Sequence, residues 1–340
     1  MTEPVGILPC QTIEALIAGG AVTSAGPFAP DQVQPASLDL RLGTTAWRVR
    51  ASFLPGPGRK VGERLPDVAM HKLDLRDGAV LERGCVYIAE VQERLALPSG
   101  VAGRANPKSS TGRVDVFVRL LTDGGAFDDV AEGYTGPLYV EIAPQTFSIL
   151  VRPGTRLNQL RLKRGVPARR AVLNVGVDLT GERAGFRARR HAGVIDLDRE
   201  DGHNPHDFWE PLEPRINRQG MGELLLDPGE FYILASKEAI EIPALDAAEM
   251  TPIDPSVGEF RVHYAGFFDP GFGTEEAAGA GSKAVLEVRS HETPFLLEDG
   301  QTVARLVYEG LSERPSRLYG FDGSHYQRQG LKLSKHFKAW

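Results

Sequence analysis

The stretch Leu81-Glu-Arg-Gly84-Cys-Val-Tyr87 returns later in the chain as Leu226-Asp-Pro-Gly229-Glu-Phe-Tyr232. Each version joins a glycine turn to a short apolar run, which is typical of a strand entered through a turn. Further positions match at the same offset or one residue more, namely Leu97-Pro98 with Ile242-Pro243, Pro107 with Pro252, Glu141 with Glu287, Gly154 with Gly300 and Gln159 with Arg305. The repeat predicts a chain built from two copies of one domain.

The composition suits two globular domains rich in strands. The chain has 340 residues, of which 41% are hydrophobic and 25% charged, so each copy can bury a core. Its 38 glycines and 24 prolines interrupt many short apolar runs, as expected for strands joined by frequent turns. We therefore expect a mainly β protein with one short helix near the start, capped by Thr12 and ended by Gly19-Gly20.

The repeat also sets the expected domain boundaries. The first copy spans residues 1–165, and a basic segment with Gly and Pro, residues 166–190, is interpreted as a connector. The second copy spans residues 191–311, and a polar tail, residues 312–340, ends the chain. Because two similar β-layers can pack together whatever their role, the differences between the copies have to carry the function.

Charge and cysteine content narrow the class of protein. The net charge is −6, and no stripe of Lys and Arg with interleaved aromatic residues indicates a nucleic-acid surface. Cys10 and Cys85 form neither a C-x-x-C pair nor a disulfide framework, which suits a reducing cytoplasm. We expect no signal peptide and no membrane span, because no basic and apolar leader opens the sequence and no apolar run is long enough.

The copies differ most between Gly103 and Arg113. The first copy has Lys108-Ser109-Ser110-Thr-Gly-Arg113 here, and backbone amides, hydroxyls and cations together are what a polyphosphate needs. The second copy has residues 249–259 at the matching place, where acidic side chains replace the cations. We therefore expect only the first copy to bind phosphate.

Both copies keep a glutamate inside an apolar strand, Glu141 in the first and Glu287 in the second. A carboxylate there is costly to bury unless it is paired, and the alternative is that it points to solvent. In the first copy Arg113 is available as a partner. A Glu141–Arg113 pair beside a serine-rich turn can activate a water, with Glu141 as general base. The second copy lacks such a cation, so we expect the first copy alone to be chemically competent.

Taken together, these motifs resemble the dCTP deaminase family of the dUTPase-like superfamily. The helix over residues 8–20 is typical of that family, and residues 108–113 resemble its Arg-Ser-Ser-x-x-Arg element with Lys108 in the leading place. Residues 127–141 resemble its Asp-Pro-Gly-Trp-x-Gly…Glu segment, although the stretch between Asp128 and Tyr134 is longer. Residues 34–43 resemble its first motif, residues 154–160 its fourth motif, and Tyr326-Gln-Arg-Gln329-Gly330 the tail that closes over the nucleotide.

The resemblance implies two tandem distorted β-barrels, a homotrimer, and hydrolytic deamination of dCTP to dUTP and ammonia, which supplies dUTP for dUMP and dTTP synthesis. By the same resemblance, Glu141 is the base, while Arg113 and Ser109 orient the water and the developing charge. Binding of the nucleotide, with Mg²⁺ carried by its triphosphate, is then expected from Lys108, Ser110, Gln159, Asp128, Tyr134, Tyr326 and Gln329. One site per chain would result, and deleting residues 312–340 is expected to abolish turnover without unfolding.

Several alternatives stay open. No zinc site is expected, because H-x-E and C-x-x-C are absent, and we interpret His203, His206 and Asp207 as a polar loop. The segment around Asp196 resembles the third dUTPase motif, but repeat order aligns Asp196 with Asp39 and favours a structural role. A catalytic Asp196 would instead indicate a bifunctional enzyme or a dUTPase, both forming dUMP. A non-catalytic nucleotide-binding module is the third possibility.

Overall fold

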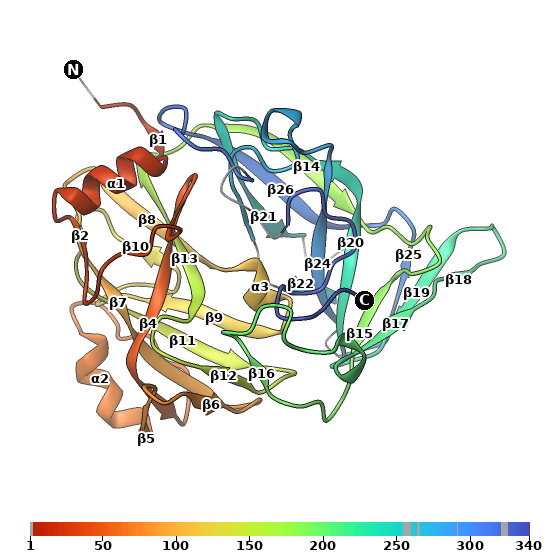
Figure 1. Ribbon diagram of the computed structural model, residues 1–340, viewed down its shortest axis with the longest axis horizontal. Helices are drawn as coiled ribbons and strands as arrows, with labels where there is room; N and C mark the ends of the chain where they lie inside the picture. The colour runs from red at the N-terminus through yellow and green to blue at the C-terminus, as the bar shows by residue number, and fades with distance from the viewer. Residues whose placement is uncertain (1–2, 254–259, 264–265, 291, 321–325) are drawn as a thin grey trace.

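The expected mainly β architecture is confirmed by the computed structural model, which describes residues 3–253, 260–263, 266–290, 292–320 and 326–340. Two bodies of strands lie side by side (Figure 1). We call residues 3–165 the first half, residues 166–311 the second half and residues 312–340 the tail.

The first half is built on an 11-stranded, partly barrel-like sheet with the order β10-β8-β13-β4-β7-β11-β9, to which β1, β2, β3 and β5 attach. These strands are β1 (Gly6–Ile7), β2 (Val22–Ser24), β3 (Val33–Gln34), β4 (Ser37–Val49), β5 (Ala69–Asp74), β7 (Val86–Ala96), β8 (Val101–Pro107), β9 (Val116–Leu121), β10 (Asp129–Val130), β11 (Thr135–Pro144) and β13 (Arg156–Arg164). A small sheet of order β16-β12-β6 lies beside it and is formed by β6 (Ala79–Leu81), β12 (Ile149–Val151) and β16 (Ile195–Asp196).

The second half repeats much of this pairing in three smaller sheets, ordered β14-β26-β21-β23, β17-β15-β20-β24-β22 and β18-β19-β25. Their strands are β14 (Arg169–Gly176), β15 (Gly185–Ala188), β17 (Trp209–Leu212), β18 (Arg215–Ile216), β19 (Gly222–Leu226), β20 (Phe231–Ile240), β21 (Asp246–Pro252), β22 (Phe260–His263), β23 (Phe267–Phe268), β24 (Ser282–Ser290), β25 (Phe295–Glu298) and β26 (Thr302–Gly310). Strand β26 lies between β14 and β21 just as β13 lies between β4 and β8, and β24 lies between β20 and β22 as β11 lies between β7 and β9.

This pairing corrects the connector predicted over residues 166–190. Strands β14 and β15 fall inside it and pair with β26 and β20, so most of the segment belongs to the second half. β14 opens with two arginines and buries only its last two residues, Val175 and Gly176, so it lacks the alternation of buried and exposed side chains that marks a half-buried strand.

The same register corrects the alignment of Asp196 with Asp39. Asp39 lies opposite Gln159 in the sheet. Arg305, the repeat equivalent of Gln159, lies opposite Asn174, so Asn174 and not Asp196 corresponds to Asp39. Asp196 instead lies on β16, which joins the small sheet of the first half, and its carboxylate accepts from Arg152 at 2.8 Å.

The predicted N-terminal helix is present as α1 (Cys10–Ala18), and it ends at Gly19 as expected. Thr12 is not its cap. The residue before the helix is Pro9, which offers no side-chain cap, and the Thr12 hydroxyl donates to Glu313 of the tail at 2.7 Å. Two further α-helices, α2 (Val61–Val68) and α3 (Ser109–Gly112), and the short 3₁₀ helices η1 (Pro205–Asp207) and η3 (Glu275–Ala277) were not predicted.

The tail is part of the hydrophobic core rather than a free lid. Leu333 and Phe337 are buried in the larger core cluster, where the Phe337 ring lies 5.4 Å from Phe208 and 5.9 Å from Trp209. Deleting residues 312–340 therefore removes core side chains. We now expect that deletion to destabilise the fold as well as the site, which corrects the outcome stated above.

Replacing Phe337 by Ala tests this anchoring. The truncation opens a cavity in an aromatic cluster and should lower the free energy of unfolding by about 3–5 kcal/mol, measured by urea denaturation. Lys338→Ala is the matched control, because the Lys338 side chain is exposed and only its backbone bonds to His203. Equal stability of the two variants would contradict a core role for the tail.

Candidate active site

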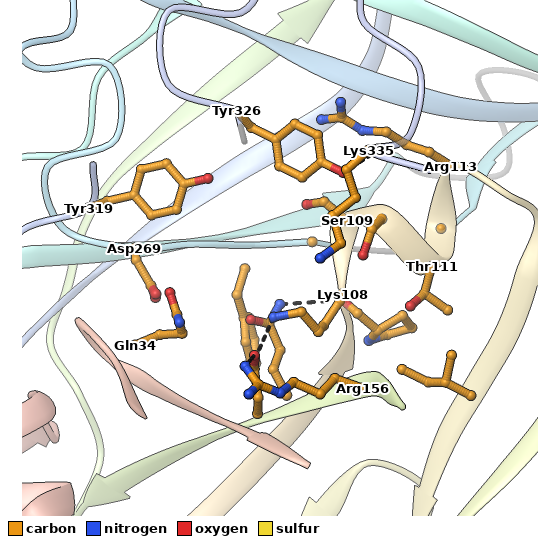
Figure 2. Close-up of a pocket in the computed structure, with 18 of the residues that line it drawn as sticks. Gln34, Lys108, Ser109, Thr111, Arg113, Arg156, Asp269, Tyr319, Tyr326 and Lys335 are labelled. Carbon is orange, nitrogen blue, oxygen red and sulfur yellow. Dashed lines mark hydrogen bonds and ion pairs between the residues drawn. The ribbon is translucent and has the colours of Figure 1, made fainter. Parts of the chain in front are cut away.

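A cavity of about 900 Å³ lies between the two halves and the tail. The first half contributes the α3 turn and parts of β4 and β13, the second half contributes residues around β23 and β24, and the tail contributes Tyr326 and Lys335 (Figure 2). Of the predicted site residues, those that line the cavity are Lys108, Ser109, Ser110, Arg113, Gln159, Tyr326 and Gln329.

One wall of the cavity carries cations that are held in place by carboxylates of the first half. Lys108 Nζ lies 2.5 Å from the buried Asp39, and Arg156 lies 2.8 Å from Asp31 and 3.4 Å from Asp39. Gln159 on β13 lies beside them and donates to the Pro107 carbonyl at 3.3 Å. This wall offers two cations and several hydroxyls to an anion such as a polyphosphate.

Arg113 sits where the halves and the tail meet. It is 2% exposed, donates to Gln329 Oε1 at 3.0 Å and to the Lys332 carbonyl at 3.1 Å, and lies 3.9 Å from the ring centre of Tyr326. Its Nε lies 4.0 Å from Oε1 of Glu287 on β24. The tail and the second half therefore meet on one guanidinium of the first half.

Glu287 is the carboxyl that faces Arg113. It is buried, and loss of hydration raises its pKa to about 8, although Arg113 acts in the opposite direction. A carboxyl with such a pKa exchanges a proton near neutral pH, as a group that moves protons during a reaction must do.

The predicted Glu141–Arg113 pair is not formed. Glu141 lies on β11 beside its register partner Arg119 of β9, and their side chains pair at 2.6 Å. The Arg119 guanidinium in turn lies 3.5 Å from the ring centre of Phe127, and Glu141 does not line the cavity. Repeat order placed Arg113 and Glu141 in one copy, but packing of the two halves brings Arg113 to the glutamate of the other.

Asp128 and Tyr134 are also outside the cavity. The Asp128 carboxyl accepts from the Leu120 amide at 2.8 Å, and burial raises its pKa to about 7. The Tyr134 hydroxyl donates to the Pro137 carbonyl at 2.7 Å. Both side chains hold the turns around β10 and β11 together, so the nucleotide contacts predicted for them are not supported by their positions.

The matching residues of the second half do line the cavity. Asp269-Pro-Gly-Phe272-Gly273 follows β23 and resembles Asp-Pro-Gly-Trp-x-Gly more closely than the longer segment of the first half does. This motif was the signal in the sequence that the prediction missed. Asp269 is held from the first half by Arg161 at 3.2 Å.

Within the described ranges, no group of three or more His, Cys, Asp and Glu side chains is arranged to hold a metal ion. His203 Nε2 accepts from the Asp196 amide at 3.0 Å and packs against Phe208, as a loop side chain does. The acids nearest the cations, Asp31 and Asp39, are engaged by Lys108 and Arg156. No helix in the described part of the chain is long and apolar enough to cross a membrane.

The β fold and its cavity, with cations and hydroxyls on one wall and a buried carboxyl on the other, define a protein equipped for hydrolytic chemistry on a nucleotide. The N-terminal domain family of 2′-deoxycytidine 5′-triphosphate deaminases matches residues 4–166, and the corresponding C-terminal domain family matches residues 154–337. The chain belongs to the dCTP deaminase family.

Similar proteins support this family assignment. The crystal structure of the 2′-deoxycytidine 5′-triphosphate deaminase from Agrobacterium tumefaciens is 53% identical with a TM-score of 0.86, covering 91% of this chain and 99% of that one. A "dCTP deaminase, dUMP-forming" from Acidothermus cellulolyticus is 32% identical over 46% of this chain and 80% of its own length. A "dCTP deaminase" from Aeropyrum pernix is 28% identical over 46% of this chain and 82% of its own length.

The raised pKa of Glu287 predicts a pH-dependent stability. Between its ordinary pKa of 4.5 and the folded value of about 8, the folded protein keeps a proton that the unfolded chain releases. The stabilisation is therefore complete below about pH 4.5 and is lost as pH rises towards 8. Glu287→Gln removes this proton, so its melting temperature should fall less than that of the wild type between pH 5 and 8.

Thermal melts of both proteins at several pH values measure the difference. Glu298→Gln, which removes an exposed carboxyl on β25, controls for the change in net charge. Parallel pH slopes for the wild type and Glu287→Gln would argue against a raised pKa at this position.

Proposed function

We propose that this chain deaminates dCTP hydrolytically to dUTP and ammonia in the cavity between its halves. The observation that carries the proposal is Glu287 of the second half facing Arg113 of the first, beside the Lys108-Ser-Ser turn. Membership of the dCTP deaminase family supports the choice of substrate.

Glu287 is the proposed proton carrier. Its carboxylate takes a proton from water and passes it to N3 of cytosine as the water oxygen bonds to C4. It then relays the hydroxyl proton to the amino group, so that the C4–N bond breaks, ammonia leaves and a carbonyl remains. Arg113, with Ser109, is proposed to orient the water and to stabilise negative charge that develops on its oxygen.

The cationic wall is the proposed phosphate site. Lys108, Ser110 and Gln159 lie there together and can bind the triphosphate, to which Mg²⁺ is bound as part of the substrate. We place the deoxyribose and base on the side of Asp269 and Phe272, in place of Asp128 and Tyr134. Tyr326 and Gln329 of the tail already contact Arg113 and would enclose the nucleotide.

We infer that the halves arose by tandem duplication, since their strand pairing and sequence offsets agree. Each chain supplies both walls of the cavity, so one site can form without a second subunit. The homotrimer implied by the family resemblance remains a prediction for mass measurement in solution, and the cytoplasmic location remains a prediction as well.

A second candidate is a bifunctional enzyme that continues to dUMP. The favouring observation is that several relatives, including those from Acidothermus cellulolyticus and Thermobifida fusca, are named dUMP-forming. Asp196, the residue considered for that step, is paired with Arg152 and does not line the cavity. The product therefore has to decide between the two candidates.

Incubation with dCTP and Mg²⁺ tests the proposal, with products separated by ion-exchange chromatography. We expect dUTP from the wild type and a loss of at least about 100-fold in kcat for Glu287→Gln, because the proton carrier is gone. Glu141→Gln is the matched control and should retain turnover, since Glu141 lies outside the cavity. Formation of dUMP would favour the bifunctional enzyme, and binding without any product would favour a nucleotide-binding module.

The pH dependence of kcat/KM gives an independent test. Because Glu287 has to be ionised to accept a proton from water, kcat/KM for dCTP should rise from pH 6.5 to 9 with an apparent pKa of about 8. His336 also lines the cavity, but burial lowers its pKa to about 4, so it does not titrate in this range. A flat profile would contradict Glu287 as the base of the free enzyme.

A further inference from the structure

A second pair of opposite charges crosses the boundary between the halves immediately beside Arg113 and Glu287. Asp115 follows Arg113 by two residues, and Arg289 follows Glu287 by two residues on β24. Residues two positions apart in a strand lie on the same face, so Glu287 and Arg289 both point towards the first half. The Arg289 guanidinium pairs with Asp115, which places a second, oppositely oriented ion pair next to the first.

In this second pair Asp115 is buried and Arg289 is partly buried, and both make further hydrogen bonds. The Asp115 side chain is 1% exposed and also accepts from the Thr146 hydroxyl at 2.5 Å. Arg289 donates to the same hydroxyl at 2.9 Å and to the Gly229 carbonyl at the turn before β20. One guanidinium of the second half is thus bonded to two side chains of the first half and to its own neighbouring turn.

The backbone of Asp115 indicates that its carboxylate is needed at this place. Asp115 has φ of 56°, in the left-handed region where a glycine has no steric penalty and other residues are uncommon. Such a conformation persists only where the surrounding contacts hold it. Here those contacts are the ion pair with Arg289, the Thr146 hydroxyl and the bond from the Gln145 amide to the Asp115 carbonyl at 2.9 Å.

Asp115 lies close to Arg113 in the chain. Arg113 directly follows α3, and Asp115 lies between Arg113 and the start of β9, so contacts that hold Asp115 also hold the chain next to Arg113. Arg113 and Glu287 are 4.0 Å apart, whereas Asp115 and Arg289 are in direct contact. The alignment of the two cavity walls therefore depends more on the Asp115–Arg289 pair than on the Arg113–Glu287 pair.

We propose that Asp115 and Arg289 are a positioning pair that holds Arg113 and Glu287 opposite each other across the two halves, a role that rests on the proposed deaminase function. Neither residue touches the reacting atoms. Loss of the Asp115–Arg289 pair should disturb the alignment of Arg113 and Glu287. The cationic wall, with Lys108 and Gln159, should stay in place.

The test uses Arg289→Gln and Asp115→Gly in the full chain. We expect kcat for dCTP to fall by about 10- to 100-fold, because small misplacements of catalytic groups have effects of that size. KM should stay within about twofold of the wild type, since substrate binding by the cationic wall is retained. Glycine adopts the φ of Asp115 without strain, so Asp115→Gly removes the carboxylate without imposing a backbone penalty.

Arg104→Gln is the matched control. Arg104 also forms an ion pair across the two halves, with Glu249 at 3.2 Å, but it does not line the cavity. Its kcat should stay close to that of the wild type, and thermal melts of all three variants establish that each is folded.

The outcomes separate the two proposals. Wild-type kcat in both Arg289→Gln and Asp115→Gly, or an equal loss in Arg104→Gln, would overturn the positioning role while the deaminase function stands. A rise in KM with unchanged kcat would overturn it too, because it would indicate a binding role. If the wild type itself forms no dUTP, the proposed function fails and this inference fails with it.

Discussion

The buried ion pair between Arg161 and Asp269 sets how the two halves face each other, and the site depends on that arrangement. Arg161 projects from β13 of the first half to Asp269 at 3.2 Å, lies 3.9 Å from the ring centre of Phe267 and donates to the Ala248 carbonyl. Burial lowers the pKa of Arg161 and raises that of Asp269, and the attraction between the two groups opposes both shifts. Removing one partner would leave an uncompensated buried charge, which costs about 3–5 kcal/mol.

The facing surfaces of the two halves are complementary in charge, because equivalent positions carry side chains of opposite sign. Arg104 of β8 lies opposite Arg161 of β13 in the first half. Glu249 occupies the place of Arg104 in the second half, on β21. These two equivalent residues form an ion pair at 3.2 Å. In the same way Lys163 and Glu309 line one small cavity of about 210 Å³ between the halves. Two copies of the first half would place like charges here, and like charges at close range disfavour association.

Glu141 and Glu287 occupy equivalent positions in the two halves, but their surroundings differ. Glu141 is paired at 2.6 Å with Arg119 from the neighbouring strand, beneath the ring of Phe127. Glu287 has its nearest described cation 4.0 Å away in the other half, and burial raises its pKa to about 8. A short ion pair holds a carboxylate in one position, whereas burial without such a close partner raises the pKa of Glu287 into the range where it can gain and lose a proton. The same residue in the same strand is therefore structural in one half and available for chemistry in the other.

Local patterns in the sequence determined much of this protein. The repeat of Gly84 and Gly229 with its short apolar runs predicted two strand-rich halves, because turn residues and strand periodicity act over a few neighbours. The Lys108-to-Arg113 segment predicted one cation and the hydroxyls of the cationic wall for the same reason, since these groups lie within one short turn, whereas Arg156 of that wall was not predicted. The helix ending at Gly19 was likewise a local signal. Only the tertiary structure decided which glutamate meets Arg113, that Asp269 rather than Asp128 enters the cavity, and that Phe337 belongs to the core. These contacts join residues more than a hundred positions apart, and they follow from how two similar surfaces pack, which no periodicity within either half encodes.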